Sequence, residues 1–237
     1  RSNEQVKGAP VGEPTGVAEV KRLFGKDGDK VLRAEVRWFF FCLTTCHTGQ
    51  VEMDEQGRPF FSGSSPDEVA FLEAAHAIGI TYRSRRRVPG TSNWDLIISG
   101  PDGEGEHSFR VLCEVPFNSD RKRMTVVCEY KGQFFCICKG ADNVMGPLCA
   151  EPFDARSTEQ LTKYSKLGLR TLAISSKVVE QSFFEDWQQK LKVAQSASED
   201  REKAIDRVAA ELEHSMVLAG ISAIEDKLQA GVPEAIV

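Results

Sequence analysis

The segment PFNSDRKRM brings an aromatic ring, an ammonium group and a thioether into one short stretch of chain. Phe117 follows Pro116 at the expected end of one strand, and Lys122 and Met124 stand near the expected start of the next. Lys122 and Met124 are expected to share a face, because side chains alternate along a strand. A flat base can stack on Phe and Met while lysine attracts phosphate oxygens, so these residue types suit an adenine nucleotide. A core position for Phe117 is the competing interpretation, because large apolar residues are usually buried.

A second candidate lies in CICKGAD, where a lysine ends an apolar strand face. Alternation places Phe135, Ile137 and Lys139 on one face, and Gly140 follows where the backbone is expected to approach a neighbour closely. Lys139 can either extend its ammonium group to solvent or project into a pocket as a partner for a phosphate or a ring edge. Asp142 is equally consistent with capping the short helix that follows.

Two further candidates stand at the start of an element. Arg170 follows the helix-ending Gly168 at the beginning of a strand, where its guanidinium can bind phosphate oxygens or form a salt bridge. Glu68 stands three residues after Ser65, the expected N-cap of a helix in SSPDEVAFLEAAHAIG. A capping-box carboxylate is the default role for Glu68, and a hydrogen bond to an adenine amino group is the alternative.

Several other chemistries are disfavoured by the sequence. The four histidines are scattered and lack the Cys/His spacing typical of zinc sites. The chain contains no G-x-x-x-x-G-K-[ST] loop, no G-x-G-x-x-G fingerprint and no G-x-S-x-G elbow. A net charge of -5 argues against a nucleic-acid-binding protein, and seven cysteines within apolar runs are typical of core thiols in a reducing compartment.

Helix and strand patterns along the rest of the chain predict an α+β fold. Residues 1–30, rich in Gly, Pro and charge, are expected to be an extended or mobile lead-in. The apolar run over residues 31–46 predicts a buried helix. Alternating runs between residues 80 and 140, the last two joined by a Lys-Gly turn, predict adjacent antiparallel strands.

Helices and strands alternate in the rest of the chain. Ser157 and Gln160 repeat the capping-box spacing at the start of a helix that ends at Gly168, and a strand is expected from there. Two helices are expected next, over residues 183–197 and 204–212, followed by a buried strand in MVLAGISAIED.

The order of these motifs along the chain resembles that of P-type ATPases of the lipid-flippase branch. The order is SPDEVAF, PFNSDRKRM, CKGADNVM, LGLRTLAIS and ISAIEDKLQAGVPEAI, covering about residues 32–237. PFNSDRKRM, KGAD and GLRTL are family-wide, whereas SPDE and IEDKLQAGVPE favour flippases over cation pumps. The resemblance implies a nucleotide-binding domain built on a twisted antiparallel sheet of about six or seven strands flanked by helices.

The resemblance also implies roles for individual residues. Phe117 resembles the ring that stacks on adenine, Glu68 the carboxylate at the adenine end of the pocket, and Lys139 the lysine beneath the base. Lys122 and Arg170 resemble the cations on the phosphate side. The remaining positions that match the pocket are Ser119, Met124 and Leu172.

Two motifs of the family are missing from this chain. It contains no DKTGT, whose aspartate accepts the phosphoryl group, and no downstream GDG-type motif that helps to hold magnesium. Phosphoryl transfer needs a nucleophile and a metal, so the isolated chain is expected to bind ATP without hydrolysing it and to hold no catalytic or metal-ligating residue. In the full-length ATPase it would present Mg-ATP to an aspartate of a neighbouring phosphorylation domain.

The same resemblance also implies partners and a cellular location. The implied partners are the phosphorylation and actuator domains of the same polypeptide, a phospholipid substrate and an accessory subunit, at the cytosolic face of a membrane. The chain itself is expected to be soluble, because it lacks a run of about 18 apolar residues. The expected divisions are a lead-in over 1–30, a nucleotide-binding domain over 31–220, and a return segment over 221–237 that contains Asp226.

Two alternatives to an ATP-binding domain are consistent with parts of the sequence. The domain could be a non-catalytic module that binds a protein or an acidic lipid through the basic run over residues 83–87 or the helices over 183–212. A stand-alone phosphohydrolase would need a nucleophile and metal-binding carboxylates that the motifs do not supply.

Overall fold

A seven-stranded sheet forms the centre of the computed structural model, which describes residues 16–25, 29–56 and 58–225. Neighbouring strands are antiparallel throughout, in the order β3-β4-β5-β6-β7-β8-β9. The α+β prediction is therefore confirmed. The strands are β3 (Thr81–Arg87), β4 (Trp94–Ser99), β5 (Glu106–Asn118), β6 (Arg123–Tyr130), β7 (Gln133–Gly140), β8 (Arg170–Val179) and β9 (Val217–Ile224).

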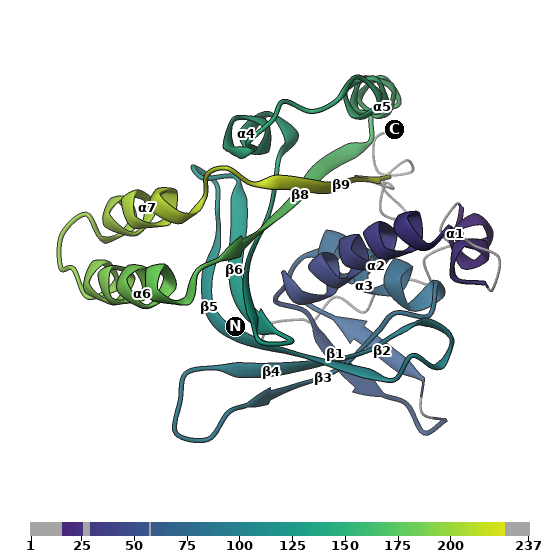
Figure 1. Ribbon diagram of the computed structural model, residues 1–237, viewed down its shortest axis with the longest axis horizontal. Coiled ribbons are helices and arrows are strands. Elements are labelled where there is room, and N and C mark those ends of the chain that lie inside the picture. The colour runs from purple at the N-terminus through teal and green to yellow at the C-terminus, as the bar shows by residue number, and fades with distance from the viewer. Residues whose placement is uncertain (1–15, 26–28, 57, 226–237) are drawn as a thin grey trace, which may run out of the picture.

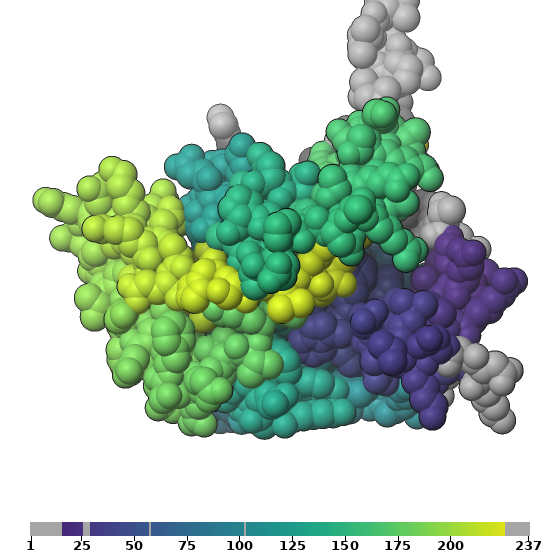
Figure 2. Space-filling model, turned by 45° about the horizontal axis from the view of Figure 1, so that its top comes forward, coloured from purple at the N-terminus to yellow at the C-terminus, as the bar shows by residue number. Residues whose placement is uncertain are grey.

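Helices cover the sheet in separate groups, as Figure 1 shows. Two apolar clusters lie against the sheet, one made with α2 and α3 and the other with α6 and α7. Figure 2 shows α4 and α5 between the α6–α7 pair and the α1–α2 pair. The helices are α1 (Val17–Phe24), α2 (Lys30–Thr45), α3 (Pro66–Ala77), α4 (Asp142–Met145), α5 (Ala155–Lys166), α6 (Gln181–Gln195) and α7 (Arg201–Leu212), with short 3-10 turns η1 (Pro101–Gly103) and η2 (Gly146–Leu148).

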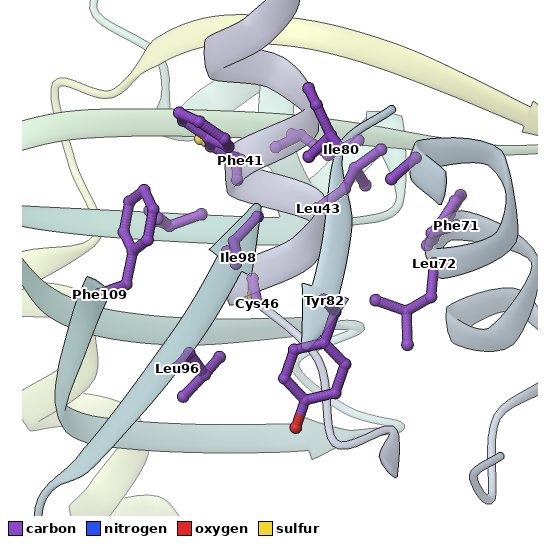
Figure 3. Packing of buried hydrophobic residues seen from close by; sticks show 14 of the residues in the cluster. Phe41, Leu43, Cys46, Phe71, Leu72, Ile80, Tyr82, Leu96, Ile98 and Phe109 are labelled. Carbon is purple, nitrogen blue, oxygen red and sulfur yellow. The ribbon is translucent and has the colours of Figure 1, made fainter. Parts of the chain in front are cut away.

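Helix α2 confirms the buried helix expected over residues 31–46. Asp29 caps it, because its side chain accepts hydrogen bonds from the backbone N–H groups of Val31 at 2.8 Å and Leu32 at 3.0 Å. The C-terminal half of α2 is buried. Phe41 packs there against the ring of Phe109 in β5, in the same cluster as side chains from α3, β3 and β4 (Figure 3).

The hairpin between β6 and β7 is also confirmed. Tyr130 pairs with Gln133, and the two residues between them, Lys131 and Gly132, have φ values of 51° and 75°. Positive φ at both central positions is what a two-residue turn between twisted antiparallel strands requires.

The expected lead-in over residues 1–30 is wrong where the structure describes it. Residues Val17–Phe24 form α1, and its two terminal side chains are buried. Arg33 of α2 donates to the carbonyl of Leu23 at 2.8 Å and to that of Gly25, so α1 packs onto the domain. A short helix with few apolar residues gives too weak a periodic pattern to stand out among Gly, Pro and charge. Residues 1–15 and 26–28 lie outside the described part.

Three smaller differences are two element boundaries and one additional sheet. Helix α5 begins earlier than expected, because Asp154 and not Ser157 is its N-cap, with the backbone N–H of Ser157 donating to the Asp154 side chain at 2.6 Å. A two-stranded sheet of β1 (Gln50–Met53) and β2 (Pro59–Ser62) was not expected. Strand β9 crosses the expected division at residue 220, so residues 221–224 belong to the sheet. Asp226 lies outside the described residues.

Candidate functional site

Most of the predicted site residues gather at one end of the sheet. The register pairs Asn118 with Arg123, Arg123 with Gly140, and Gly140 with Ala173, so β5 and β7 end where β6 and β8 begin. This is the end near α4 and α5 (Figure 1). The predicted residues that lie in or beside these strand ends are Phe117, Ser119, Lys122, Met124, Lys139, Arg170 and Leu172.

Glu68 reaches the same end from α3. Its Oε1 lies 2.9 Å from the Nζ of Lys139, and both residues are buried, at 7% and 6% exposed. The other carboxylate oxygen accepts from the backbone N–H and the hydroxyl of Thr48, each at 2.9 Å. Two residues that sequence motifs proposed separately are thus one buried ion pair, and both oxygens of its carboxylate accept hydrogen bonds.

Electrostatics keep this carboxylate ionised. Burial by itself would raise the pKa of Glu68, but the Lys139 ammonium and the hydrogen bonds from Thr48 outweigh it, so the pKa lies below its usual value. His47, which precedes Thr48, is fully buried, and burial lowers its pKa to about 4. The His47 ring is therefore neutral at pH 7, and its Nε2 donates to the carbonyl of Thr44 at 3.0 Å because that carbonyl can only accept.

The helix start at Ser65 is confirmed, but the capping-box role for the carboxylate of Glu68 is wrong. The backbone N–H of Glu68 donates to the Ser65 hydroxyl at 3.4 Å, as an N-cap requires. The carboxylate itself turns to Thr48 and Lys139 instead of back to the N-cap. The carboxylate of Glu68 therefore interacts with residues distant in the chain and not with the N-cap of its own helix.

Lys139 does not extend to solvent. Besides Glu68, its Nζ faces the ring of Phe71 in α3, 5.5 Å from the ring centroid. Ile137 and Phe135, which share its strand face, pack in the cluster beneath α2 and α3. The alternation predicted for β7 is therefore confirmed, with the lysine as its buried polar end.

Phe117 is the last residue but one of β5, just before the β5–β6 turn, and 62% of its area is exposed. The competing core interpretation of Phe117 is thus wrong. Lys122 does not belong to a strand, because its φ is +50° and β6 begins only at Arg123. The expectation that Lys122 and Met124 share a strand face is also wrong, since Met124 is 2% exposed within the core and Lys122 is exposed.

Gly140 allows this turn to lie against the end of β7. A Cβ atom at residue 140 would stand 2.6 Å from the Cβ of Arg123 and 2.7 Å from the carbonyl oxygen of Lys122. The backbone N–H of Ala141 donates to that same carbonyl at 3.1 Å. The close approach expected at Gly140 is therefore made to the β5–β6 turn of the protein itself.

Arg170 stands at the start of β8 and forms an ion pair with α3. Its Nη1 lies 2.8 Å and 3.0 Å from the two carboxylate oxygens of Asp67, the neighbour of Glu68. Leu172 is half-buried and packs against the α2–α3 cluster. Asp142 is not a cap, because Ala141 is the N-cap of α4 and no side chain caps that helix.

Thr48 and Asp67 contact the site but were missed by the sequence analysis. Thr48 follows α2 in a stretch without periodicity, and only the fold brings it to Glu68, 20 residues away in the chain. Asp67 lies inside the SPDE motif, so its position beside Glu68 could have drawn attention to it.

Two depressions in the described surface are not lined by Phe117, Glu68 or Lys139. One, of about 200 Å³, lies between β5 and α6, and the other, of about 560 Å³, lies between α4 and α5. Within the described ranges, no group of three or more His, Cys, Asp or Glu side chains is placed to hold a metal ion. Nor is any helix there long and apolar enough to cross a membrane. The candidate site is therefore defined by the contacts and charges of its residues and not by a detected cavity or metal-binding cluster.

Comparison with known proteins identifies the family of this chain. A family model described as the cytoplasmic domain N of P-type ATPases matches residues 35–231. The chain is 38% identical over 210 residues to phospholipid-transporting ATPase 10 of Arabidopsis thaliana and to phospholipid-transporting ATPase IC of Homo sapiens, which covers 86% and 85% of the chain. The aligned part spans only 17% and 16% of those relatives. The chain belongs to the family of P-type ATPase cytoplasmic N domains.

Proposed function

We propose that the domain binds ATP at the end of the sheet where Phe117 lies, and presents its γ-phosphate to an aspartate in a neighbouring domain. The observation that carries the proposal is the exposed ring of Phe117 at the same sheet end as the buried Glu68–Lys139 pair. An aromatic ring left in water at a fixed strand end offers a stacking surface for a base.

The charges at this end suit the rest of the nucleotide. Lys122 is exposed in the turn after Phe117, and the Arg170 side chain is 45% exposed at the start of β8. Both cations can approach the phosphates, with Arg170 exchanging or sharing its contact with Asp67. Ser119 is exposed beside Phe117 and can offer a hydroxyl.

The buried residues form the support of the proposed pocket. Met124 pairs with Lys139 across β6 and β7, and Leu172 lies on β8. The Glu68–Lys139 pair provides a polar floor with an ammonium group for ring nitrogens and a carboxylate for the adenine amino group. Its internal hydrogen bonds keep both side chains in place before the ligand arrives.

The full-length protein is proposed to be an ATP-driven phospholipid transporter, in line with the names of its relatives. In that protein the N domain would contribute binding and orientation of Mg-ATP, while the phosphorylation domain supplies the aspartate. Closure between the two domains would bring the γ-phosphate into line with the aspartate. The actuator domain, the lipid substrate and an accessory subunit at the cytosolic face of a membrane belong to the same proposal.

A residue-resolved NMR titration with ATP tests the binding site. A separated N domain lacks the contacts of its neighbour, so a dissociation constant in the high-micromolar to millimolar range, roughly -4 to -6 kcal/mol, is expected. Amide shifts should change in the β5–β6 turn, at the end of β7 and at the start of α3. Shift changes confined to α6 and α7, or none up to about ten millimolar ATP, would contradict the proposal.

The alternative of a docking module gains no support from the basic strand β3. Arg85 pairs with Glu114 and lies over Trp94, and Arg83 donates to the Ser99 hydroxyl. Arg87 also lies over Trp94. Three of the four arginines in this strand thus have partners within the domain, whereas Arg86 is exposed.

A further inference from the structure

A buried carboxylate, Glu213, accepts hydrogen bonds from the β5–β6 turn that follows Phe117 and from β6. Glu213 follows α7, and its side chain is 0% exposed. One carboxylate oxygen accepts from Arg121 and from the Thr125 hydroxyl, and the other accepts from Arg123 at 2.7 Å. The three donors come from the PFNSDRKRM turn and the strand after it, 88 to 92 residues away in the chain.

Arg121 connects this carboxylate to both neighbours of Phe117. Its Nη1 donates to the carbonyl of Pro116 at 3.3 Å, and its backbone N–H donates to the side chain of Asn118 at 2.7 Å. The Arg121 side chain is 3% exposed, and its Nε lies 3.3 Å from a carboxylate oxygen of Asp206 in α7. Phe117 is thus exposed, while Pro116 on one side is bound by the buried guanidinium of Arg121 and Asn118 on the other side by the Arg121 backbone.

We infer that Glu213 is a positioning residue for the nucleotide site, acting through Arg121 on Phe117 and Lys122. The inference rests on the proposed binding of ATP at this turn. The exposed ring of Phe117 has little packing of its own, and Lys122 adopts a φ of +50° that non-glycine residues rarely adopt, so the turn needs an external support. A buried carboxylate with three donors supplies one, as side chains behind a binding site commonly do.

Electrostatics alone predicts the opposite effect of removing this charge. Glu213→Gln takes one negative charge from the surroundings of a polyanion site, so a purely through-space effect would strengthen ATP binding. Loss of positioning would weaken it. The sign of the change in affinity therefore separates the two mechanisms.

The test compares Glu213→Gln with Glu114→Gln, which removes the same charge from the Arg85–Glu114 pair. ATP affinity is measured by calorimetry, and backbone order parameters over residues 117–122 by NMR without ligand. Glu213→Gln is expected to weaken ATP binding about tenfold and to lower the order parameters from about 0.85 towards 0.6, while Glu114→Gln changes neither.

Other outcomes distinguish failure of the positioning role of Glu213 from failure of the proposed function. If the wild-type chain binds ATP and Glu213→Gln binds it equally well or more tightly, the positioning role is overturned and the proposed function stands. If the wild-type chain binds no ATP, the proposed function fails, and the positioning role fails with it. Should Glu213→Gln not fold, Arg121→Lys takes its place, because lysine keeps the charge but lacks the forked guanidinium whose Nη1 and Nη2 reach Pro116 and Glu213 separately.

Discussion

The Nζ of Lys139 lies 2.9 Å from Oε1 of Glu68, and Thr48 donates two hydrogen bonds to the other oxygen of that carboxylate. The pair joins the end of β7 to the first turn of α3 beneath the proposed nucleotide site. Removal of either charge leaves the other buried without its partner, which costs more than the net worth of the intact pair.

We predict that Lys139→Met lowers the free energy of unfolding by about 3–5 kcal/mol, because it leaves the Glu68 carboxylate uncompensated. The double variant Glu68→Gln/Lys139→Met should lose less than Lys139→Met alone, since the glutamine amide carries no charge. Urea denaturation of the two single variants and the double variant measures the coupling. If the loss of unfolding free energy in the double variant equals the sum of the losses in the two single variants, the two charges do not interact.

The second prediction concerns pH and His47. Its folded-state pKa of about 4 lies below the ordinary value of 6.5, so the unfolded chain binds more protons between these values. The free energy of unfolding should therefore fall as pH drops from 6.5 to 4, and His47 should contribute about 3 kcal/mol to this fall. The lowered pKa of Glu68 acts in the same direction, with stability lost as the pH falls below its ordinary value.

His47→Gln is the matched variant for this pH dependence, because its amide nitrogen can still donate to the carbonyl of Thr44. Denaturation midpoints at several pH values should give a shallower slope for the variant than for the wild type. Identical slopes would mean that His47 does not titrate in this window.

A third prediction concerns Gly140. Gly140→Ala places a methyl group against the carbonyl of Lys122 and the Cβ of Arg123, so it should destabilise the domain by about 1–3 kcal/mol and shift the amide resonances of the β5–β6 turn. Gly146→Ala is the control, because no atom lies within 4 Å of its added Cβ and its φ of -53° is helical. Equal behaviour of the two variants would rule out a special close approach at Gly140.

The sequence predicted local features well, because they depend on neighbours in the chain. The sequence patterns identified the strands of the seven-stranded sheet, and the Ser65 cap, the Lys131-Gly132 turn and the α2 run were all correct. The resemblance in motif order selected Phe117, Lys139 and Glu68 together before the structure placed the latter two in contact.

Non-local contacts and short elements could not be predicted in this way. The partners of Glu68 are 20 and 71 residues distant, and no periodic pattern specifies them. The left-handed backbone of Lys122 removed it from the strand and broke the expected alternation with Met124. Glu213 lies in a helix-ending stretch with no motif, so its contact with Arg121 emerges only from the fold.

Calorimetry of ATP binding to Phe117→Ala tests the proposed stacking of adenine on Phe117. Phe117 is 62% exposed, so its truncation should leave stability nearly unchanged. Phe183→Ala is the matched control, a 42% exposed phenylalanine on α6. Phe117→Ala is expected to weaken ATP binding about tenfold or more, as the loss of one base-stacking contact does, while Phe183→Ala leaves the affinity unchanged. Wild-type affinity in folded Phe117→Ala would show that adenine does not stack on this ring.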